Sequence, residues 1–200
     1  MTRRAGVTRQ QAVAVAADLA DAHGLEALTL ADVAAVLGIR LPSLYNHIDG
    51  LPGMQRELAV LGCRQIIAAL NRAAIGKSSD DAVIAVAQAL RQYALEHPGL
   101  YAAIQRAPAP DDLELQQLSQ EIIGIVLAVL QPYGLDPESA IHAVRGLRAI
   151  THGFATLELA GGFGLPLDRD ESFLRLLRAY LAGLRSVDCY DSGGDTADTA

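Results

Sequence analysis

The chain has 200 residues, of which 51% are hydrophobic and 4% aromatic, and its formal net charge is −7. This hydrophobic content supports a folded core and excludes a globally disordered chain. Two cysteines are too few for a disulfide framework. No uncharged apolar run reaches the roughly 18 residues of a membrane span. The first residues lack the apolar block of a signal peptide, so we expect a cytoplasmic protein without a membrane partner.

Helical periodicity dominates the chain, and no strand-like alternation stands out. Thr8 forms a Thr-x-x-Gln capping box with Gln11 and begins a first helix, which ends at Gly24. A short second helix begins at Thr29 and ends at Gly38. The residues 49–53 and 97–99 read as breakers. The sequence predicts an all-α fold of about nine helices. The remaining helices are expected at about 41–47, 54–74, 81–96, 100–106, 112–131, 136–160 and 170–187.

Residues 29–48 contain two short helices joined by a tight turn that starts at Gly38, which is a helix-turn-helix arrangement. The second helix is short enough to lie in the major groove of B-DNA, which is about 12 Å wide. Val33, Leu37 and Leu44 are expected to pack the two helices together. Spacing alone leaves open a helical protein that has the same turn and no DNA function.

Three segments carry a family resemblance, namely LADVA at 30–34, LGI at 37–39 and LYNHI at 44–48. With the Ala-x-x-Leu-Ala pattern at 16–20, they resemble the TetR family of bacterial transcriptional regulators. The resemblance covers about residues 8–62 and implies a DNA-binding domain over 1–53. The family usually has a lysine in the segment that reads Asp-Gly-Leu-Pro-Gly at 49–53 here.

The resemblance implies a DNA contact for each matching position. It implies that Thr29 caps the second helix and that Tyr45 and His47 meet the phosphate backbone, to which a hydroxyl or an imidazole N–H can donate. Positions 40, 41 and 43 usually meet base edges in the family. Arg56 and the N-terminal arm are candidates for additional positive charge. The implied DNA-binding set is Thr29, Arg40, Leu41, Ser43, Tyr45, Asn46, His47, Arg3 and Arg4.

A second resemblance lies in HPGLY at 97–101, IHAVRGLR at 141–148 and THGF at 151–154. These segments look like the effector-binding domain of a TetR subgroup whose hallmark is Trp-His-Gly, with Thr151 in place of the tryptophan. The resemblance implies an effector-binding and dimerisation domain over 54–187, followed by an acidic tail at 188–200 that we expect to be disordered. Candidate pocket residues, each of which could also be ordinary core, are Tyr93, Tyr101, Ile104, Ile122, Val126, Arg148, His152 and Phe154.

Gly146 and Gly153 lie two helical turns apart, so they share a helix face that another helix could approach closely. In the TetR family the last two helices pair with their copies in a symmetric dimer. The candidate interface, for which intramolecular core is the alternative, is Gly146, Ile150, Gly153, Leu157, Phe173, Leu177, Tyr180, Leu181 and Leu184.

The sequence therefore predicts a homodimeric repressor that binds a palindromic operator in double-stranded DNA and is released by a small molecule. The apolar C-terminal half favours a lipophilic or aromatic effector. One alternative is a helical ligand-binding or protein-interaction dimer without DNA binding. Another is a helical metal-carboxylate enzyme. Against an enzyme, the histidines lack a zinc spacing with cysteine, and a single Glu138–His142 pair falls short of a di-iron site. We expect no cofactor, metal or catalytic residue.

The distribution of charge is compatible with DNA binding. Residues 1–64 hold six basic and six acidic side chains, so the whole net charge of −7 lies outside the DNA-reading segment. The acidic total predicts weak non-specific affinity at physiological salt, and therefore reliance on specific contacts and on the dimer.

Overall fold

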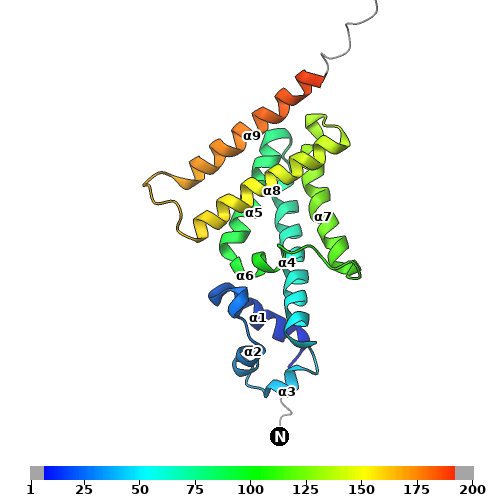
Figure 1. The fold of residues 1–200 in the computed structure, drawn as a ribbon, viewed down its shortest axis with the longest axis vertical. Coiled ribbons are helices and arrows are strands. Elements are labelled where there is room, and N and C mark those ends of the chain that lie inside the picture. The colour runs from blue at the N-terminus through cyan, green and yellow to red at the C-terminus, as the bar shows by residue number, and fades with distance from the viewer. Residues whose placement is uncertain (1–6, 192–200) are drawn as a thin grey trace, which may run out of the picture. The chain divides into compact units, whose positions relative to one another are not determined.

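The computed structural model describes residues 7–191. Residues 1–6, with the predicted contacts Arg3 and Arg4, and residues 192–200 of the predicted tail lie outside the described residues, as do the side chains of 186–191. Within this range the regular elements are helices, nine α-helices and two 3-10 turns (Figure 1), which confirms the all-α prediction. They are α1 Arg9–His23, η1 Leu25–Ala27, α2 Leu30–Val36, α3 Leu41–Leu44, α4 Gly50–Ala74, α5 Ser79–Glu96, α6 Pro98–Ala103, α7 Leu113–Leu130, η2 Gln131–Tyr133, α8 Pro137–Leu159 and α9 Arg169–Asp191.

The chain forms two compact units, which we call unit 1 and unit 2. The described part of unit 1 comprises residues 7–67 and 93–120, and that of unit 2 comprises 68–92 and 121–191. Helices α4, α5 and α7 each continue from one unit into the other. Helix α6 and the first two turns of α7 thus group with the helix-turn-helix segment, which the predicted boundary at residue 53 does not anticipate.

The predicted beginnings of the first two helices are confirmed. The capping box of α1 is complete, because Thr8 Oγ1 accepts from Gln11 N and Gln11 Oε1 accepts from Thr8 N. Thr29 caps α2 in the same way, with its side chain accepting from the backbone N–H of Asp32. Each cap satisfies an N–H group that has no partner within its helix.

Two helix boundaries next to the recognition turn differ from prediction. Regular α3 ends at Leu44 rather than at residue 47 or 48, although Ile48 N still donates to Leu44 O at 3.1 Å and so continues the helical turn. Helix α4 begins at Gly50, whose φ is +70°, rather than at Met54. The segment at 49–53 begins a helix because Pro52 falls in the first turn, where a missing N–H breaks no hydrogen bond.

Helix α6 of unit 1 lies directly against the end of α1. A Cβ atom added to Gly99 would lie 2.2 Å from the carbonyl carbon of Ala20, so a side chain cannot be accommodated there without moving backbone. One carboxylate oxygen of Asp21 accepts from the N–H groups of Gly99 and Leu100, at 2.8 and 3.0 Å. Its other oxygen lies 2.9 Å from Nδ1 of His97. The HPG segment, expected to be a breaker, therefore starts α6 and anchors it to α1.

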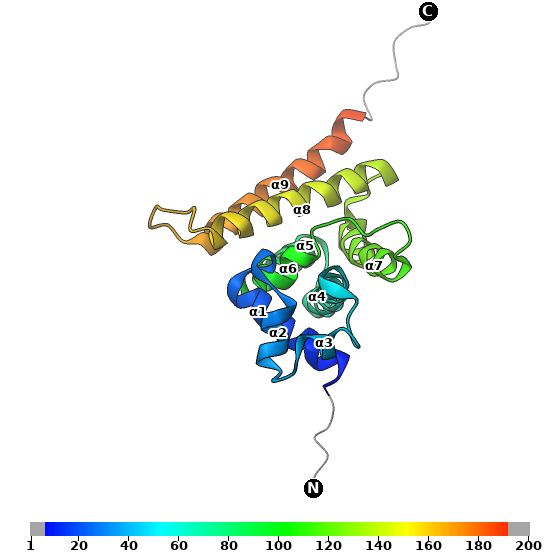
Figure 2. The same cartoon turned by 60° about the horizontal axis from the view of Figure 1, so that its bottom comes forward.

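Helices α8 and α9 of unit 2 lie side by side and antiparallel (Figures 1 and 2). Gly146 permits the close approach, since a Cβ there would lie 2.3 Å from the hydroxyl oxygen of Tyr180. That hydroxyl donates to Ala143 O at 2.8 Å. Helix α9 extends to Asp191, so residues 188–191 of the predicted disordered tail are helical.

Arg91 of α5 is a buried charge that contacts the end of α8 and the start of α9. Its guanidinium donates to both oxygens of Glu158, at 2.8 and 3.0 Å, and to Asp170 at 2.7 Å. The guanidinium carbon also lies 5.2 Å from the ring centres of Phe154 and Phe173. Paired carboxylates and aromatic faces together compensate the desolvation of this arginine.

Among the described residues, the stretch 113–133 is long and apolar enough to cross a bilayer, with a mean hydropathy of 1.3. This result rests on length and composition alone. The stretch includes two acidic residues, Glu114 and Glu121, and the longest uncharged run of the chain begins only after Glu121. Only 11% of its apolar window is buried within the chain. The core helix of a soluble protein passes the same test, so the result does not place α7 in a membrane.

Candidate DNA-binding surface and effector groove

The recognition turn, residues 40–48, has one packed face and one exposed face. Leu44 and Ile48 are buried, as expected from the sequence, and α3 lies against α2, in which Leu30 and Val33 are buried. This packing fixes the direction of the opposite face, which therefore points to solvent.

Most of the DNA contacts that the family resemblance implies lie on that exposed face. Arg40 is the N-terminal cap residue of α3, and the Tyr45 side chain is 54% exposed. Leu41 is half-buried. Among the residues that the structure describes, no hydrogen-bond or ion-pair partner is present for the exposed side chains Arg40, Ser43, Tyr45, Asn46 and His47. These groups are available to phosphate oxygens and base edges.

Thr29 has a different position. Its hydroxyl is engaged on Asp32, since it accepts from the Asp32 N–H at 3.2 Å and donates to Asp32 Oδ2 at 2.6 Å. The local geometry accounts for this threonine as the cap of α2.

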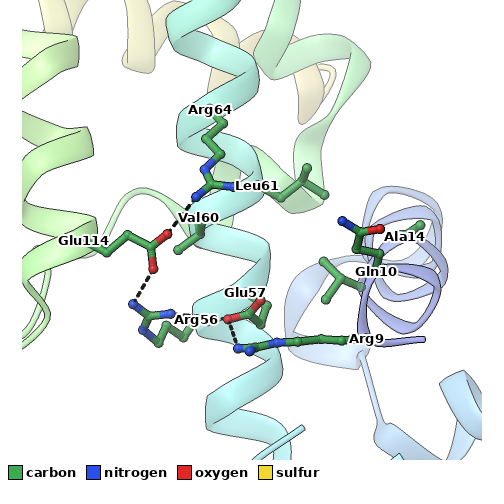
Figure 3. Close-up of a pocket in the computed structure, with 10 residues that line it drawn as sticks. Arg9, Gln10, Ala14, Arg56, Glu57, Val60, Leu61, Arg64 and Glu114 are labelled. Atoms are coloured by element: carbon green, nitrogen blue, oxygen red, sulfur yellow. Dashed lines mark hydrogen bonds and ion pairs between the residues drawn. The ribbon is translucent and has the colours of Figure 1, made fainter. Parts of the chain in front are cut away.

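Three arginines of unit 1, in contrast, are neutralised by carboxylates, namely Arg9 of α1 and Arg56 and Arg64 of α4 (Figure 3). Arg9 pairs with Glu57, and Arg64 donates to Glu114 at 2.8 Å. Arg56 grips Asp112 with two hydrogen bonds, Nε to Oδ2 at 2.6 Å and Nη2 to Oδ1 at 2.7 Å. The Arg56 side chain, suggested by the sequence as an extra charge for DNA, is therefore committed to carboxylates.

We call Arg56, Asp112 and Glu114 the Arg56 cluster. Arg56 Nη2 also donates to Glu114 at 2.9 Å and Nη1 donates to Glu57 at 3.3 Å, so three carboxylates share one guanidinium. These contacts raise the pKa of Arg56 and hold the pKa of Asp112 below its ordinary value of 3.8. In each case the hydrogen bond between the two side chains is the largest cause.

Two hollows of unit 1 meet at Arg56, which lines both of them. The α1–α4 hollow has a volume of about 610 Å³ and is rimmed by the paired ions Arg9, Glu57, Arg64 and Glu114 (Figure 3). The second, which we call the α4–α7 groove, has a volume of about 300 Å³. It is lined by Gln55, Arg56, Ala59, Cys63, Ala103, Ile104, Arg106, Ala107, Pro108, Ala109, Asp112, Leu115 and Ser119.

The α4–α7 groove is mainly apolar. Ala59, Ile104 and Leu115 contribute hydrocarbon, and Cys63 contributes a thiol that is 3% exposed. Burial raises the pKa of the Cys63 thiol to about 11, so it is protonated at neutral pH and behaves as a small apolar group. The polar groups are concentrated at Arg56, Asp112 and Arg106.

The predicted pocket residues divide between the two units. Ile104 lines the α4–α7 groove of unit 1. Tyr93 and Tyr101 are buried in the same unit, and the Tyr93 hydroxyl donates to Gln65 at 2.9 Å. The other groove residues are not predictable from the sequence, because only long-range contacts bring α4, the segment 104–112 and the start of α7 together.

The pocket candidates in unit 2 have varied settings. Ile122 and Val126 are half-buried on α7, Arg148 is exposed and His152 is half-buried. Phe154 is buried and lines a hollow of about 250 Å³ at the α8–α9 connection, with Phe163 and Leu165 among its neighbours. Thr151, at the tryptophan position of the Trp-His-Gly motif, is 1% exposed, and its hydroxyl has no hydrogen-bond partner among the described residues.

Three of the predicted dimer residues belong instead to the core of unit 2. Phe173, Leu177 and Leu181 are 0% exposed, so they have no surface to offer a partner. The Tyr180 side chain of the same chain fills the space next to Gly146. Surface remains at the half-buried Ile150, Gly153, Tyr180 and Leu184 and at the exposed Leu157 and Leu176, of which Leu176 was not predicted.

Comparison with known proteins agrees with this architecture. Residues 83–180 match the family described as tetracyclin repressor-like, C-terminal domain. The TetR protein of Acinetobacter baumannii AYE, solved in complex with minocycline, superposes with a TM-score of 0.70 at 17% identity. The match covers 91% of this chain and 98% of that one, and shows a shared fold.

Two relatives extend the similarity over nearly the full length. The HTH-type transcriptional regulator Rv0681 of Mycobacterium tuberculosis is 36% identical over 200 residues, which is 100% of this chain and 90% of that protein. The HTH-type transcriptional regulator YobS of Bacillus subtilis is 35% identical over 186 residues, covering 92% of this chain and 96% of that protein. The chain belongs to the TetR family of helix-turn-helix transcriptional regulators.

Proposed function

We propose that this regulator is a cytoplasmic homodimeric repressor that binds a palindromic operator through residues 40–47 and leaves it when a small molecule binds. The observation that supports the DNA site is the exposed face of the recognition turn, where five polar side chains have no partner among the described residues. In a dimer, two such turns would enter successive major grooves about 34–36 Å apart.

For the dimer, we propose the exposed remainder of α8 and α9. Leu157 is 52% exposed and Leu176 is 41% exposed, and a Cβ at Gly153 would meet nothing within 4 Å, so that face is open. Leu157→Arg should raise the dimer dissociation constant in sedimentation experiments while the chain stays folded. An unchanged constant would contradict this interface.

For the effector, we propose the α4–α7 groove. Small-molecule sites are mostly apolar with a few placed polar groups, and the groove has this composition, whereas charged pairs rim the α1–α4 hollow. A ligand releases DNA only if it binds the two states unequally. The Trp-His-Gly subgroup remains a proposal, supported by the His-Gly pair that follows Thr151.

The DNA proposal is tested on the DNA upstream of the gene for this chain, by fluorescence anisotropy over a range of salt concentrations. We expect Arg40→Ala and Tyr45→Ala to weaken binding by about 5- to 150-fold, corresponding to about 1–3 kcal/mol per lost contact. Arg72→Ala, which removes an exposed arginine from the last turn of α4, is the matched control and should bind normally. Binding by both site variants as tight as wild type would contradict the site.

A further inference from the structure

We propose that the ligand of the α4–α7 groove is a small apolar acid, and that its carboxylate displaces Asp112 from Arg56 and so frees the segment 104–112 from α4. This inference rests on the proposed effector function and names the ligand class and the switch. The supporting observation is that Arg56 and Asp112 both line the groove and are joined by two hydrogen bonds.

The segment 104–112 and the start of α7 form one hydrogen-bonded piece. Asp112 caps α7, since its carboxylate accepts from Leu115 N at 3.2 Å. The Gln116 amide donates to the carbonyl oxygens of Ala109 and Pro110, at 2.9 and 2.8 Å. The same Asp112 carboxylate that organises this piece is the one that Arg56 grips, so a change at Arg56 acts on the whole segment.

On the α4 side, Arg56 belongs to the part of the helix that packs the DNA-binding domain. Met54 and Leu58, which flank it, are 0% exposed. One turn earlier, Gly53 lies against Ile48, the last residue of the recognition turn, with 3.9 Å between a Cβ at Gly53 and Ile48 Cγ2. The Arg56–Asp112 pair therefore joins the groove wall to the helix that supports the recognition turn.

Two arginines and one aspartate line the groove. Arg56 is already hydrogen-bonded to Asp112, Glu114 and Glu57, so a ligand carboxylate can reach it only by exchange with one of these groups. Arg106 is 81% exposed, and its carboxylate neighbour Glu26, itself 86% exposed, lies 3.6 Å away, which makes a weak surface pair. A ligand carboxylate would find Arg106 at the rim and compete with Asp112 for the fork of Arg56. The hydrocarbon of Ala59, Ile104 and Leu115 would cover an apolar body.

The ligand arm of the test uses acids with matched neutral amides, namely octanoate with octanamide and 1-naphthoate with 1-naphthamide. Titration calorimetry on the full chain should show at least one acid binding about tenfold tighter than its amide, and Arg106→Gln should reduce that preference. Amides that bind as well as the acids, or no binding by either acid, would overturn the ligand class.

The switch arm uses Asp112→Asn, which keeps a capping side chain for α7 but removes the charge. Amide hydrogen exchange over 104–112 should accelerate, and affinity for the upstream DNA should fall about tenfold, a typical coupling between two sites. Arg72→Gln is the control, because it removes an exposed arginine of α4 that does not line the groove. Arg56→Gln should reproduce Asp112→Asn, and the double variant should add little to either single change.

Exchange and DNA affinity unchanged in Asp112→Asn would overturn the switch. A wild-type chain that fails to bind the upstream DNA would instead count against the DNA function, while calorimetry and hydrogen exchange would still decide the ligand class and the release of 104–112.

Discussion

Gly99 and Ala20 meet backbone to backbone, with the position of a Cβ on Gly99 only 2.2 Å from the Ala20 carbonyl carbon. This contact joins α6 to the end of the first helix of the DNA-binding domain. Asp21 secures it by accepting from the N–H groups of Gly99 and Leu100. Residues beyond the predicted boundary at 53 are thus part of the same compact unit as the helix-turn-helix.

Gly99→Ala should separate α6 from α1. The new methyl group would overlap main-chain atoms of Ala20 and Asp21, which have no rotamer to change, so we expect a loss of about 2 kcal/mol or more. Gly124→Ala is the control, because Gly124 also lies within a helix and its Cβ would meet nothing within 4 Å. The control should gain up to about 1 kcal/mol from helix propensity. Urea unfolding compares the two, and equal effects would contradict the contact.

Thr151→Val should stabilise the chain. The substitution keeps the branched shape and removes a buried hydroxyl that has no hydrogen-bond partner in the part of the chain that the structure describes. We expect a gain of about 1–2 kcal/mol, since a buried unsatisfied hydroxyl costs about 1–3 kcal/mol. Thermal unfolding measures the change. A destabilised variant would show that the Thr151 hydroxyl has a partner.

Phe173→Ala should act on folding and leave dimerisation alone. Phe173 is 0% exposed and stacks near Phe154, with 4.9 Å between ring centres, and Arg91 lies over its ring. Removing it should cost about 3–5 kcal/mol of unfolding free energy. In sedimentation experiments under native conditions the dimer dissociation constant should not move. A weaker dimer with unchanged unfolding would return Phe173 to the interface.

The Arg56–Asp112 pair should give a defined pH dependence. The pKa of Asp112 is lowered in the folded chain, so its ion pair contributes stability above the ordinary pKa of 3.8 and loses it as pH falls through the lowered value. The half-exposed pair is worth about 0.5–1 kcal/mol. We expect the stability gap between wild type and Asp112→Asn to be constant from about pH 8 to 5 and to narrow below about pH 4. A gap that widens on acidification would contradict the pairing.

Local signals in the sequence predicted the helices well. The caps at Thr8 and Thr29 and the stop at Gly24 depend on neighbouring residues alone, and they are confirmed. The predicted starts of α4 and α6 are too late. Proline and glycine are common both in loops and in the first turn of a helix, so their presence alone does not distinguish the two.

The candidate DNA-binding and effector sites were only partly predictable, because part of each depends on contacts between residues far apart in the sequence. The exposed face of the recognition turn follows from local periodicity together with the family resemblance. The commitment of Arg56 to Asp112, 56 residues away, depends on a long-range contact that no spacing reveals. Phe173, Leu177 and Leu181 have the helical spacing of a dimer interface, but the same spacing also suits packing of α9 within the chain. Their complete burial in the structure assigns them to the core.

DNA binding by the recognition turn is tested most directly by the salt-dependent affinity of the wild-type chain for its own upstream DNA, measured beside Tyr45→Ala. We expect a specific complex whose log affinity falls with log salt by about 0.9 for each phosphate neutralised. We also expect Tyr45→Ala, with Tyr45 exposed on the recognition turn, to weaken this complex while the chain stays folded. No salt-sensitive specific complex, or a variant that binds as tightly as wild type, would contradict DNA binding by the recognition turn.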